Sequence, residues 1–221
     1  MSKNIVVLPI EQLVQFSSDA ICDLTYIINE GYRKQIVKYG IVVNPRIDSP
    51  DSFFIDLSLK PKTCLFYIMI DDITKIGGPL KLIQENNDQN TRLHEIDPSG
   101  KYENYRFPME NTRATVAYRP LPYSENINAY EVTAFCSFAK HAGIDIYEST
   151  KRDFGTRFPT CNELIVRVIV EHDLVSYYHD KLGFTEYNRT LIRCDKLLES
   201  GFQRTFKTNS DFNIADMRQP L

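Results

Sequence analysis

Two adjacent tyrosines, Tyr177 and Tyr178, lie in the segment EHDLVSYYHDKLGF at residues 171–184. A phenol at the mouth of a helix can donate a proton to a leaving group, which is general acid catalysis. The alternative is core packing, because Tyr178 lies four residues after Leu174 and four before Leu182, the spacing of an apolar helical stripe. The residues alone leave both interpretations of Tyr178 open.

Two further pairs of residues have types that could carry chemistry. Cys136 with His141 as its base would form a nucleophilic pair, but a thiol within an apolar strand is more often inert core. His172 and His179 are interleaved with acidic residues, yet their seven-residue separation matches no compact zinc pattern. We therefore expect packing for Cys136, solvated helix-end positions for both histidines, and no metal site.

The elements that would position these residues follow from the spacing of apolar side chains. A repeat of three to four residues between 9 and 38 predicts one long amphipathic helix or two short ones. Further helices are expected at 144–158 and, carrying both tyrosines, at 173–181. Apolar, β-branched and aromatic runs predict strands at 63–72, 76–83, 114–122, 129–138, 163–171, 184–192 and 212–221.

The connections between these strands are also predictable. The short turns favour two hairpins, 63–72 with 76–83 and 114–122 with 129–138. The order strand, helix, strand around residues 144–158 predicts a crossover, which places the strands before and after it parallel to each other.

Residues 84–112 are polar and asparagine-rich, and they contain two prolines and a glycine. Their apolar content is too low for a separate core, so we expect a polar insertion in a single domain spanning 1–221. The insertion is either a flap on the substrate side or a segment without a role. Exposed aromatic residues at Tyr102, Tyr105 and Phe107 would favour contact with another molecule.

The helix that ends at Leu182-Gly183-Phe184, between two strands, resembles the C-terminal half of the GCN5-related N-acetyltransferase (GNAT) superfamily. The segment AYEVTAFCSF at 129–138 is similar to the family's central strand, and KHAGID at 140–145 falls where the family has a glycine-containing turn. The resemblance covers nearly the whole chain. It implies an α/β fold with a mixed, mainly antiparallel sheet of six or seven strands and helices on both faces.

The resemblance also implies acetyl-CoA as cosubstrate. In this family the acyl-CoA lies between two splayed parallel strands, and backbone N–H groups at a helix N-terminus bind its pyrophosphate. A glycine in that turn leaves room for the phosphates. The implied cofactor-binding residues are Thr133, Phe135 and Cys136 on the strand, and Lys140, His141, Ala142, Gly143, Ile144 and Asp145 in the turn.

Catalytic roles follow from the same resemblance. Tyr178 matches the family's proton donor to the departing thiolate, and Tyr177 is the second choice because the helix is one residue longer than the commonest spacing. Glu131 lies where members often place a water-activating carboxylate, although a solvent-facing strand glutamate is the alternative. A backbone N–H near Phe135 or Cys136 would bind the oxyanion.

Two residues depart from the family pattern. Asp145 lies in the first helical turn, where a carboxylate competes with phosphate, and Glu171 replaces a common asparagine. The implied function is transfer of an acetyl group from acetyl-CoA to a primary amine of a small molecule or peptide. The alternative is a degenerate, non-catalytic member that acts as a binding or interaction protein.

Composition excludes some classes of partner. The formal net charge is -3 and the basic residues are scattered, so nucleic acid is not an expected partner. Five widely spaced cysteines are typical of reduced intracellular thiols that serve in packing. Apolar runs are too short for a signal peptide or a membrane span, so we expect a soluble protein of the cytoplasm or nucleus that makes no membrane contact.

Overall fold

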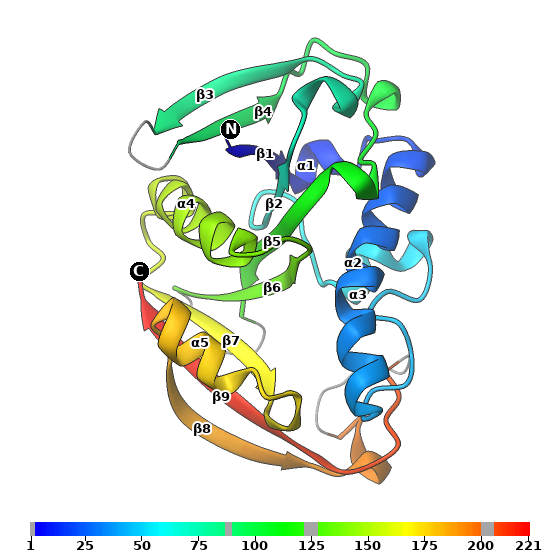
Figure 1. Cartoon of the computed structure of the whole chain (residues 1–221), viewed down its shortest axis with the longest axis vertical. Helices are drawn as coiled ribbons and strands as arrows, with labels where there is room; N and C mark the ends of the chain where they lie inside the picture. Colours follow the sequence, from blue (N-terminus) through cyan, green and yellow to red (C-terminus); the bar gives the residue numbers. More distant parts are fainter. Residues whose placement is uncertain (1–2, 87–89, 122–127, 200–205) are drawn as a thin grey trace.

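A computed structural model describes residues 3–86, 90–121, 128–199 and 206–221. Within these ranges, nine strands form one sheet in the order β3-β4-β1-β2-β5-β6-β7-β9-β8 (Figure 1). The strands are β1 (Lys3–Pro9), β2 (Leu65–Ile70), β3 (Leu80–Asn86), β4 (Thr91–Ile96), β5 (Thr112–Pro120), β6 (Ala129–Ser137), β7 (Glu163–Ile169), β8 (Thr185–Ile192) and β9 (Phe212–Pro220). The helices are α1 (Ile10–Leu13), α2 (Ser18–Tyr39), α3 (Phe53–Asp56), α4 (Ala142–Arg157) and α5 (Val175–Leu182).

The sheet is mixed and mainly antiparallel, which confirms the predicted fold class. Among the described residues, only the pairs β1–β4 and β6–β7 are parallel. The β6–β7 pair flanks the crossover through α4, as the order of elements predicts. The expected number of six or seven strands is wrong, because the sequence pattern does not predict β1 and β4.

One of the two predicted hairpins is wrong. β2 pairs with β1 and β5, whereas β3 pairs with β4. All six residues of β2 are buried, so this strand belongs to the middle of the sheet rather than to a peripheral hairpin. The hairpin of β5 with β6 is confirmed, although the expected strand end at Pro122 and the turn residues 123–127 lie outside the described residues.

The polar insertion at 84–112 contains β4, which pairs in parallel with β1. Two of its aromatic residues, Tyr105 and Phe107, are 0% and 1% exposed. Their rings stack on Phe16 with centroid distances of 5.1 and 5.9 Å. The expectation of exposed aromatics is therefore wrong for these two residues, because they complete the core beneath α2.

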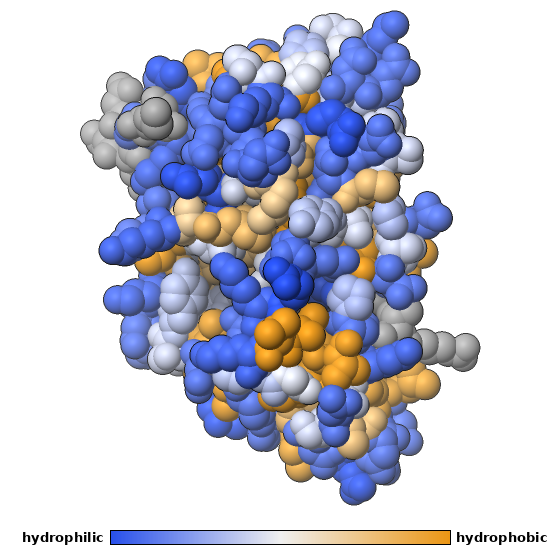
Figure 2. Space-filling model, turned by 45° about the vertical axis from the view of Figure 1, so that its right-hand side comes forward, coloured by the Kyte–Doolittle hydropathy of each residue, from blue (hydrophilic) through white to orange (hydrophobic). Residues whose placement is uncertain are grey.

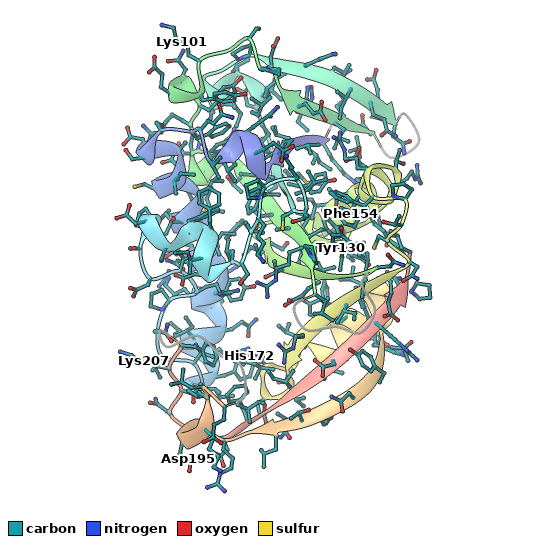
Figure 3. The ribbon with its side chains drawn as sticks, turned by 180° about the vertical axis from the view of Figure 1, so that it is seen from behind. Lys101, Tyr130, Phe154, His172, Asp195 and Lys207 are labelled. Carbon is teal, nitrogen blue, oxygen red and sulfur yellow. The ribbon has the colours of Figure 1, made fainter. Side chains whose placement is uncertain are left out.

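Helices cover both faces of the sheet, as predicted (Figure 1). The predicted helix at 9–38 is the four-residue α1 followed by the 22-residue α2. The Ser17 hydroxyl accepts a hydrogen bond from the Ala20 N–H and caps α2, and Gly40 ends it in a left-handed conformation. On the opposite face, Phe154 of α4 packs against Tyr130 of β6 with ring centroids 5.1 Å apart (Figure 3).

Hydrophilic side chains are spread over the face shown in Figure 2, which carries an apolar patch in its lower half. None of the helices in the described ranges is long and apolar enough to cross a membrane.

Candidate active site

The parallel strands β6 and β7 separate along their length. Residues 129–131 pair in register with residues 163–165. Beyond these pairs, both strands line a cavity of about 660 Å³. Its wall includes Tyr32 of α2 on one face of the sheet and Tyr178 of α5 on the other. The cavity therefore passes between the two strands and connects the two faces of the sheet.

A β-bulge interrupts β6 at the wall of this cavity. The β5–β6 register shifts so that two residues, Ala134 and Phe135, oppose the single residue Val116. Ala134 has a φ of 48°, and its carbonyl oxygen accepts a 2.7 Å hydrogen bond from the Thr115 hydroxyl. A bulge re-aims the backbone of a strand and often lies beside a binding site. The bulge is thus at the position where the sequence places an oxyanion-binding N–H, near Phe135 or Cys136.

The turn after β6 presents backbone donors at the positive end of α4. In the described residues, the N–H groups of His141 and Ile144 have no hydrogen-bond partner. The Ala142 N–H donates to the Ala139 carbonyl and the Gly143 N–H to the Ser137 hydroxyl, each over 3.2 Å. Of the four backbone N–H groups of residues 141–144, two are thus available to bind a phosphate, and the other two already have protein partners.

Six of the nine predicted cofactor-binding residues line the cavity: Thr133, Phe135, Cys136, His141, Gly143 and Ile144. The other three, Lys140, Ala142 and Asp145, lie outside its wall. Lys140 is exposed, and Ala142 is buried against the core under α4. The Asp145 carboxylate lies 2.9 Å from the Lys3 ammonium of β1. These three side chains are therefore not placed to contact a molecule in the cavity.

Gly143 allows a close approach between α4 and α5. A Cβ atom on Gly143 would lie 2.9 Å from the Tyr177 hydroxyl oxygen and 3.4 Å from the Phe135 ring. The first of these distances is shorter than a normal contact. Tyr177 consequently lies at the end of the cavity where phosphate is expected, and its phenol also gives the chain a packing reason for glycine at position 143.

Tyr178 lines the cavity beside the bulge. Its ring packs with a centroid distance of 6.1 Å to Phe135 at the bulge. Burial raises the pKa of the Tyr178 phenol, and nearby Tyr32 of α2, Tyr177 and Cys136 act in the same direction. The phenol is therefore protonated at neutral pH. Of the two tyrosines, Tyr178 is the one beside the bulge.

Glu131 lines the cavity, so the alternative of a solvent-facing glutamate is wrong. The residue is 8% exposed. Its Oε2 atom accepts hydrogen bonds from Arg119 Nε at 3.0 Å and Nη2 at 2.7 Å. The guanidinium is fixed in turn by donation to the Leu57 carbonyl over 2.7 Å. Glu131 and Arg119 thus form a buried ion pair on the α2 side of the cavity.

Cys136 is a packing residue in the structure. Its Sγ atom lies 3.8 Å from the Ile28 carbonyl oxygen of α2, and burial raises the pKa of the thiol to about 12. The thiol is therefore not an activated nucleophile. Cys64 and Cys161 are buried as well, but Cys22 and Cys194 are exposed, so the prediction that the cysteines serve in packing is wrong for these two.

The two histidines have different environments. His179 is exposed, as predicted, with Nδ1 2.8 Å from an Asp180 oxygen. His172 is only 8% exposed and lines the cavity, so the prediction of a solvated position is wrong for this residue. No group of three or more histidine, cysteine, aspartate or glutamate side chains in the described ranges could hold a metal ion.

Glu171 has a structural partner. Its carboxylate accepts hydrogen bonds from the backbone N–H and the side-chain amide of Asn213, both at 2.9 Å. The side chain thereby fixes the start of β9 and is not part of the cavity wall.

Sequence reasoning missed the residues that line the α2 side of the cavity. They include Tyr32, Gln35, Arg46, Arg119 and, as a cavity residue, His172. The sequence contains a pattern that could have identified two of these residues. Tyr32 and Gln35 continue the three-to-four spacing of the inward face of α2 beyond Ile28.

The sheet, its splayed parallel pair and the flanking helices have the GNAT fold. The structure is similar to that of a candidate phosphinothricin N-acetyltransferase, with a TM-score of 0.53 and 10% identity over 100% of this chain and 99% of that chain. It is also similar to a candidate acetyltransferase from Staphylococcus epidermidis, with a TM-score of 0.50 and 9% identity over 99% of this chain and 98% of that chain.

Comparison of sequences identifies the family more narrowly than the fold does. The chain is 30% identical over 226 residues to the sporulation protein RMD6 of Saccharomyces cerevisiae, which covers 99% of this chain and 95% of the relative. The family model described as sporulation protein RMD6 matches residues 1–221. The chain therefore belongs to the sporulation protein RMD6 family.

Proposed function

We propose that the chain is an N-acetyltransferase that moves an acetyl group from acetyl-CoA to a primary amine of a small molecule or peptide. The observation that carries this proposal is the cavity between β6 and β7, which joins the N-terminus of α4 on one face to the inward side of α2 on the other. Acetyl-CoA would enter from the α4 face. The amine would approach from the α2 face.

The residues of the α4 face would hold the cosubstrate. The N–H groups of His141 and Ile144 lie at the positive end of α4 and suit a pyrophosphate. Thr133 and Phe135 would lie along the pantetheine arm. The bulge at Ala134 would bring the thioester carbonyl to the backbone of β6.

Acetyl transfer requires a nucleophilic nitrogen, a polarised carbonyl and a proton for the leaving sulfur. The amine nitrogen bonds to the carbonyl carbon, and the carbon–sulfur bond breaks. In our proposal Tyr178 donates its phenolic proton to the departing thiolate. The nitrogen loses a proton in the same turnover, and Glu131, whose Oε2 atom is engaged by Arg119, is the proposed acceptor.

A thiol-release assay across a panel of primary amines tests this proposal. We expect the wild-type chain to release CoA with at least one amine. Tyr178→Phe should lower kcat by about 100-fold or more, in the range of a lost general acid. Tyr177→Phe, which removes a hydroxyl at the phosphate end, should change KM for acetyl-CoA more than kcat. If instead Tyr177→Phe lowers kcat and Tyr178→Phe changes mainly KM, Tyr177 is the general acid.

A non-catalytic binding protein is the second candidate. The observation that favours it is the narrow phosphate end, where the Ala142 and Gly143 N–H groups are already bonded and the Tyr177 hydroxyl lies against Gly143. Under this alternative, acetyl-CoA would not bind, and no amine would release CoA. Acetyl-CoA binding without thiol release would instead indicate a cofactor-binding protein without transferase activity.

A further inference from the structure

The cavity ends in a chamber beneath the C-terminal part of α2. We call it the Gln35–His172 chamber and define it by Gln35, Ile36, Val42, Ile169, His172 and Ile214. Ile169 and Ile214 are neighbours in the β7–β9 register. Val42 forms an antiparallel bridge to Thr208, which joins the loop after α2 to the segment before β9. The wall is mainly aliphatic, so polar groups in it require partners.

Two buried polar atoms of this chamber have no hydrogen-bond partner within the described residues. They are Oε1 of Gln35 and Nε2 of His172. His172 is 8% exposed and lies between the lower end of α2 and strands β7 and β9 (Figure 3). An unsatisfied buried polar atom costs about 1–3 kcal/mol, so two in one chamber point to a ligand that satisfies them.

Both side chains are held in place by the fold. The His172 ring stacks on Tyr39 with centroids 5.1 Å apart and an interplanar angle of 24°. The Tyr39 hydroxyl donates to the Asp173 carboxylate over 3.3 Å and accepts from the Lys38 ammonium over 2.6 Å. Gln35 lies one helical turn before Tyr39 on the same face of α2. The Gln35 amide therefore comes from one turn of α2, and the His172 imidazole packs against the next.

The charges around the cavity disfavour a cationic group here. Among the described residues that line the cavity, five are lysine or arginine and two, Asp56 and Glu131, are acidic. Both carboxylates already have partners, since Asp56 accepts from the Asp48 N–H over 2.9 Å and from Ser52, and Glu131 accepts from Arg119. A cationic arm would find no unpaired carboxylate among these lining residues.

An anionic group has a better site elsewhere in the cavity. The Arg46 guanidinium lies over the Tyr32 ring, with its central carbon 5.9 Å from the ring centroid. It donates to the Asp56 carbonyl and makes no ion pair with any described residue. A carboxylate would be drawn to Arg46, which lies over Tyr32, one turn of α2 before Gln35. The neutral Gln35–His172 chamber is thus left for a neutral polar group.

We propose that the Gln35–His172 chamber binds a neutral amide group of the acceptor, which donates a hydrogen bond to Gln35 and accepts one from His172. This inference rests on the proposed acetyltransferase function and names its substrate class: a primary amine joined through an aliphatic stem to a carboxamide or peptide group. A peptide group carries one donor and one acceptor, which matches the two orphan atoms. Aliphatic neighbours such as Ile36 and Ile169 would contact the stem.

Matched acceptors test the substrate class. The amines are ω-amino carboxamides with two to five methylene groups, compared at each length with the corresponding ω-amino acid, diamine and alkylamine. We expect the best carboxamide to exceed its alkylamine by roughly tenfold in kcat/KM, the value of one to two hydrogen bonds. Preference for the diamine or for the carboxylate would overturn the proposal, and preference for the carboxylate would assign recognition to Arg46.

Two variants locate the recognition. Gln35→Met keeps the length of the side chain and removes its amide, and His172→Phe keeps a ring to stack on Tyr39 and removes both nitrogens. Each should reduce the carboxamide preference several-fold and leave KM for acetyl-CoA unchanged. His179→Phe, at an exposed site, is the matched control and should keep the preference. If both chamber variants keep it too, the proposal is wrong.

A binding measurement separates this inference from the function on which it rests. Butanamide, which has no amine to acetylate, is titrated into protein labelled with ¹⁵N in its four histidines. We expect it to shift the ring resonances of His172 in the wild type and not in Gln35→Met. If this shift occurs while no amine is acetylated, the amide site stands and the acetyltransferase function fails. If amines are acetylated but His172 does not respond, the amide site is overturned alone.

Discussion

The Lys3 ammonium lies 2.9 Å from the Asp145 carboxylate and links β1 to the first turn of α4. The carboxylate is thereby turned toward β1 and away from the cavity, whose wall it does not join. A residue that departs from the GNAT sequence pattern is thus compatible with a phosphate site at the same helix end.

Replacing Asp145 should have little effect on cofactor binding. We expect Asp145→Asn to leave the affinity for acetyl-CoA within about twofold, and to change the free energy of unfolding by roughly 0.5 kcal/mol, because partly exposed ion pairs contribute little. Calorimetric titration and urea denaturation measure the two quantities. A tenfold gain in affinity would mean that the carboxylate competes with phosphate for the backbone N–H groups.

Gly143 and Tyr177 should be coupled. Gly143→Ala places a Cβ atom 2.9 Å from the Tyr177 hydroxyl oxygen, so we expect a destabilisation of about 1–3 kcal/mol. Tyr177→Phe removes that oxygen and should recover part of the loss in the double variant. Gly155→Ala in the same helix is the control, since its Cβ would meet only the Leu221 side chain at 3.3 Å. Additive free energies of unfolding for positions 143 and 177 would contradict the coupling.

The ion pair of Arg119 with Glu131 should matter more for stability than a surface pair. Glu131→Gln leaves the Arg119 charge largely buried without its counterion, which should cost about 3 kcal/mol of unfolding free energy. Adding Arg119→Met should restore most of this loss, as measured by urea denaturation. The double variant also separates a catalytic role of Glu131 from its structural role. A stable double variant with a much lower kcat supports Glu131 as the base. An unchanged kcat shows that Glu131 is not the base.

His172 should make stability depend on pH. Burial lowers the pKa of its imidazole below the ordinary value of 6.5, and nearby Glu171 opposes this shift. Between the lowered pKa and 6.5 the unfolded chain binds more protons than the folded chain, so stability is fully present above about pH 6.5 and falls as the pH drops below it.

Urea denaturation at pH 7.5 and 5.5 measures this dependence. His172→Phe should lose less stability than the wild type between the two pH values, while His179→Phe, altered at an exposed site, should match the wild type. Some acid sensitivity should persist in His172→Phe, because burial also lowers the pKa of His94. An unchanged loss in His172→Phe would show that His172 is not held in its neutral form.

The two strands that the sequence pattern does not predict, β1 and β4, were missed for different reasons. β1 has the residues Ile5 to Leu8 buried on both faces, so it shows a continuous apolar run without the alternation of a half-buried strand. β4 is polar in sequence because Arg92 is exposed, Glu95 is half-buried, and two of the buried positions are Thr91 and His94. Neither segment has the alternating signal on which strand prediction depends.

Strand pairing is less predictable than strand position. β2 and β3 are neighbours in the chain, but β2 enters the middle of the sheet, and β3 pairs with β4 at its edge. Local turn residues do not encode that choice. By contrast, the parallel β6–β7 pair was predictable, because a strand–helix–strand unit has one favoured handedness and direction.

The candidate site was predictable where it depends on one local motif. The β6 strand and the turn at His141 to Ile144 were found from the order of residues around Gly143. The α2 side was not, because Arg46, Arg119 and His172 come from separate segments and meet only in the folded chain. Gln35 and Tyr32 follow a helical repeat that by itself indicates packing rather than a cavity wall.

Calorimetric titration with acetyl-CoA measures whether the passage between β6 and β7 is an acyl-CoA site. Such a site predicts micromolar binding by the wild-type chain, which is a binding free energy of about -8 kcal/mol. It also predicts weaker binding by Gly143→Ala than by Gly155→Ala. The absence of any binding at millimolar acetyl-CoA would contradict the claim and leave the GNAT fold of this chain to another use.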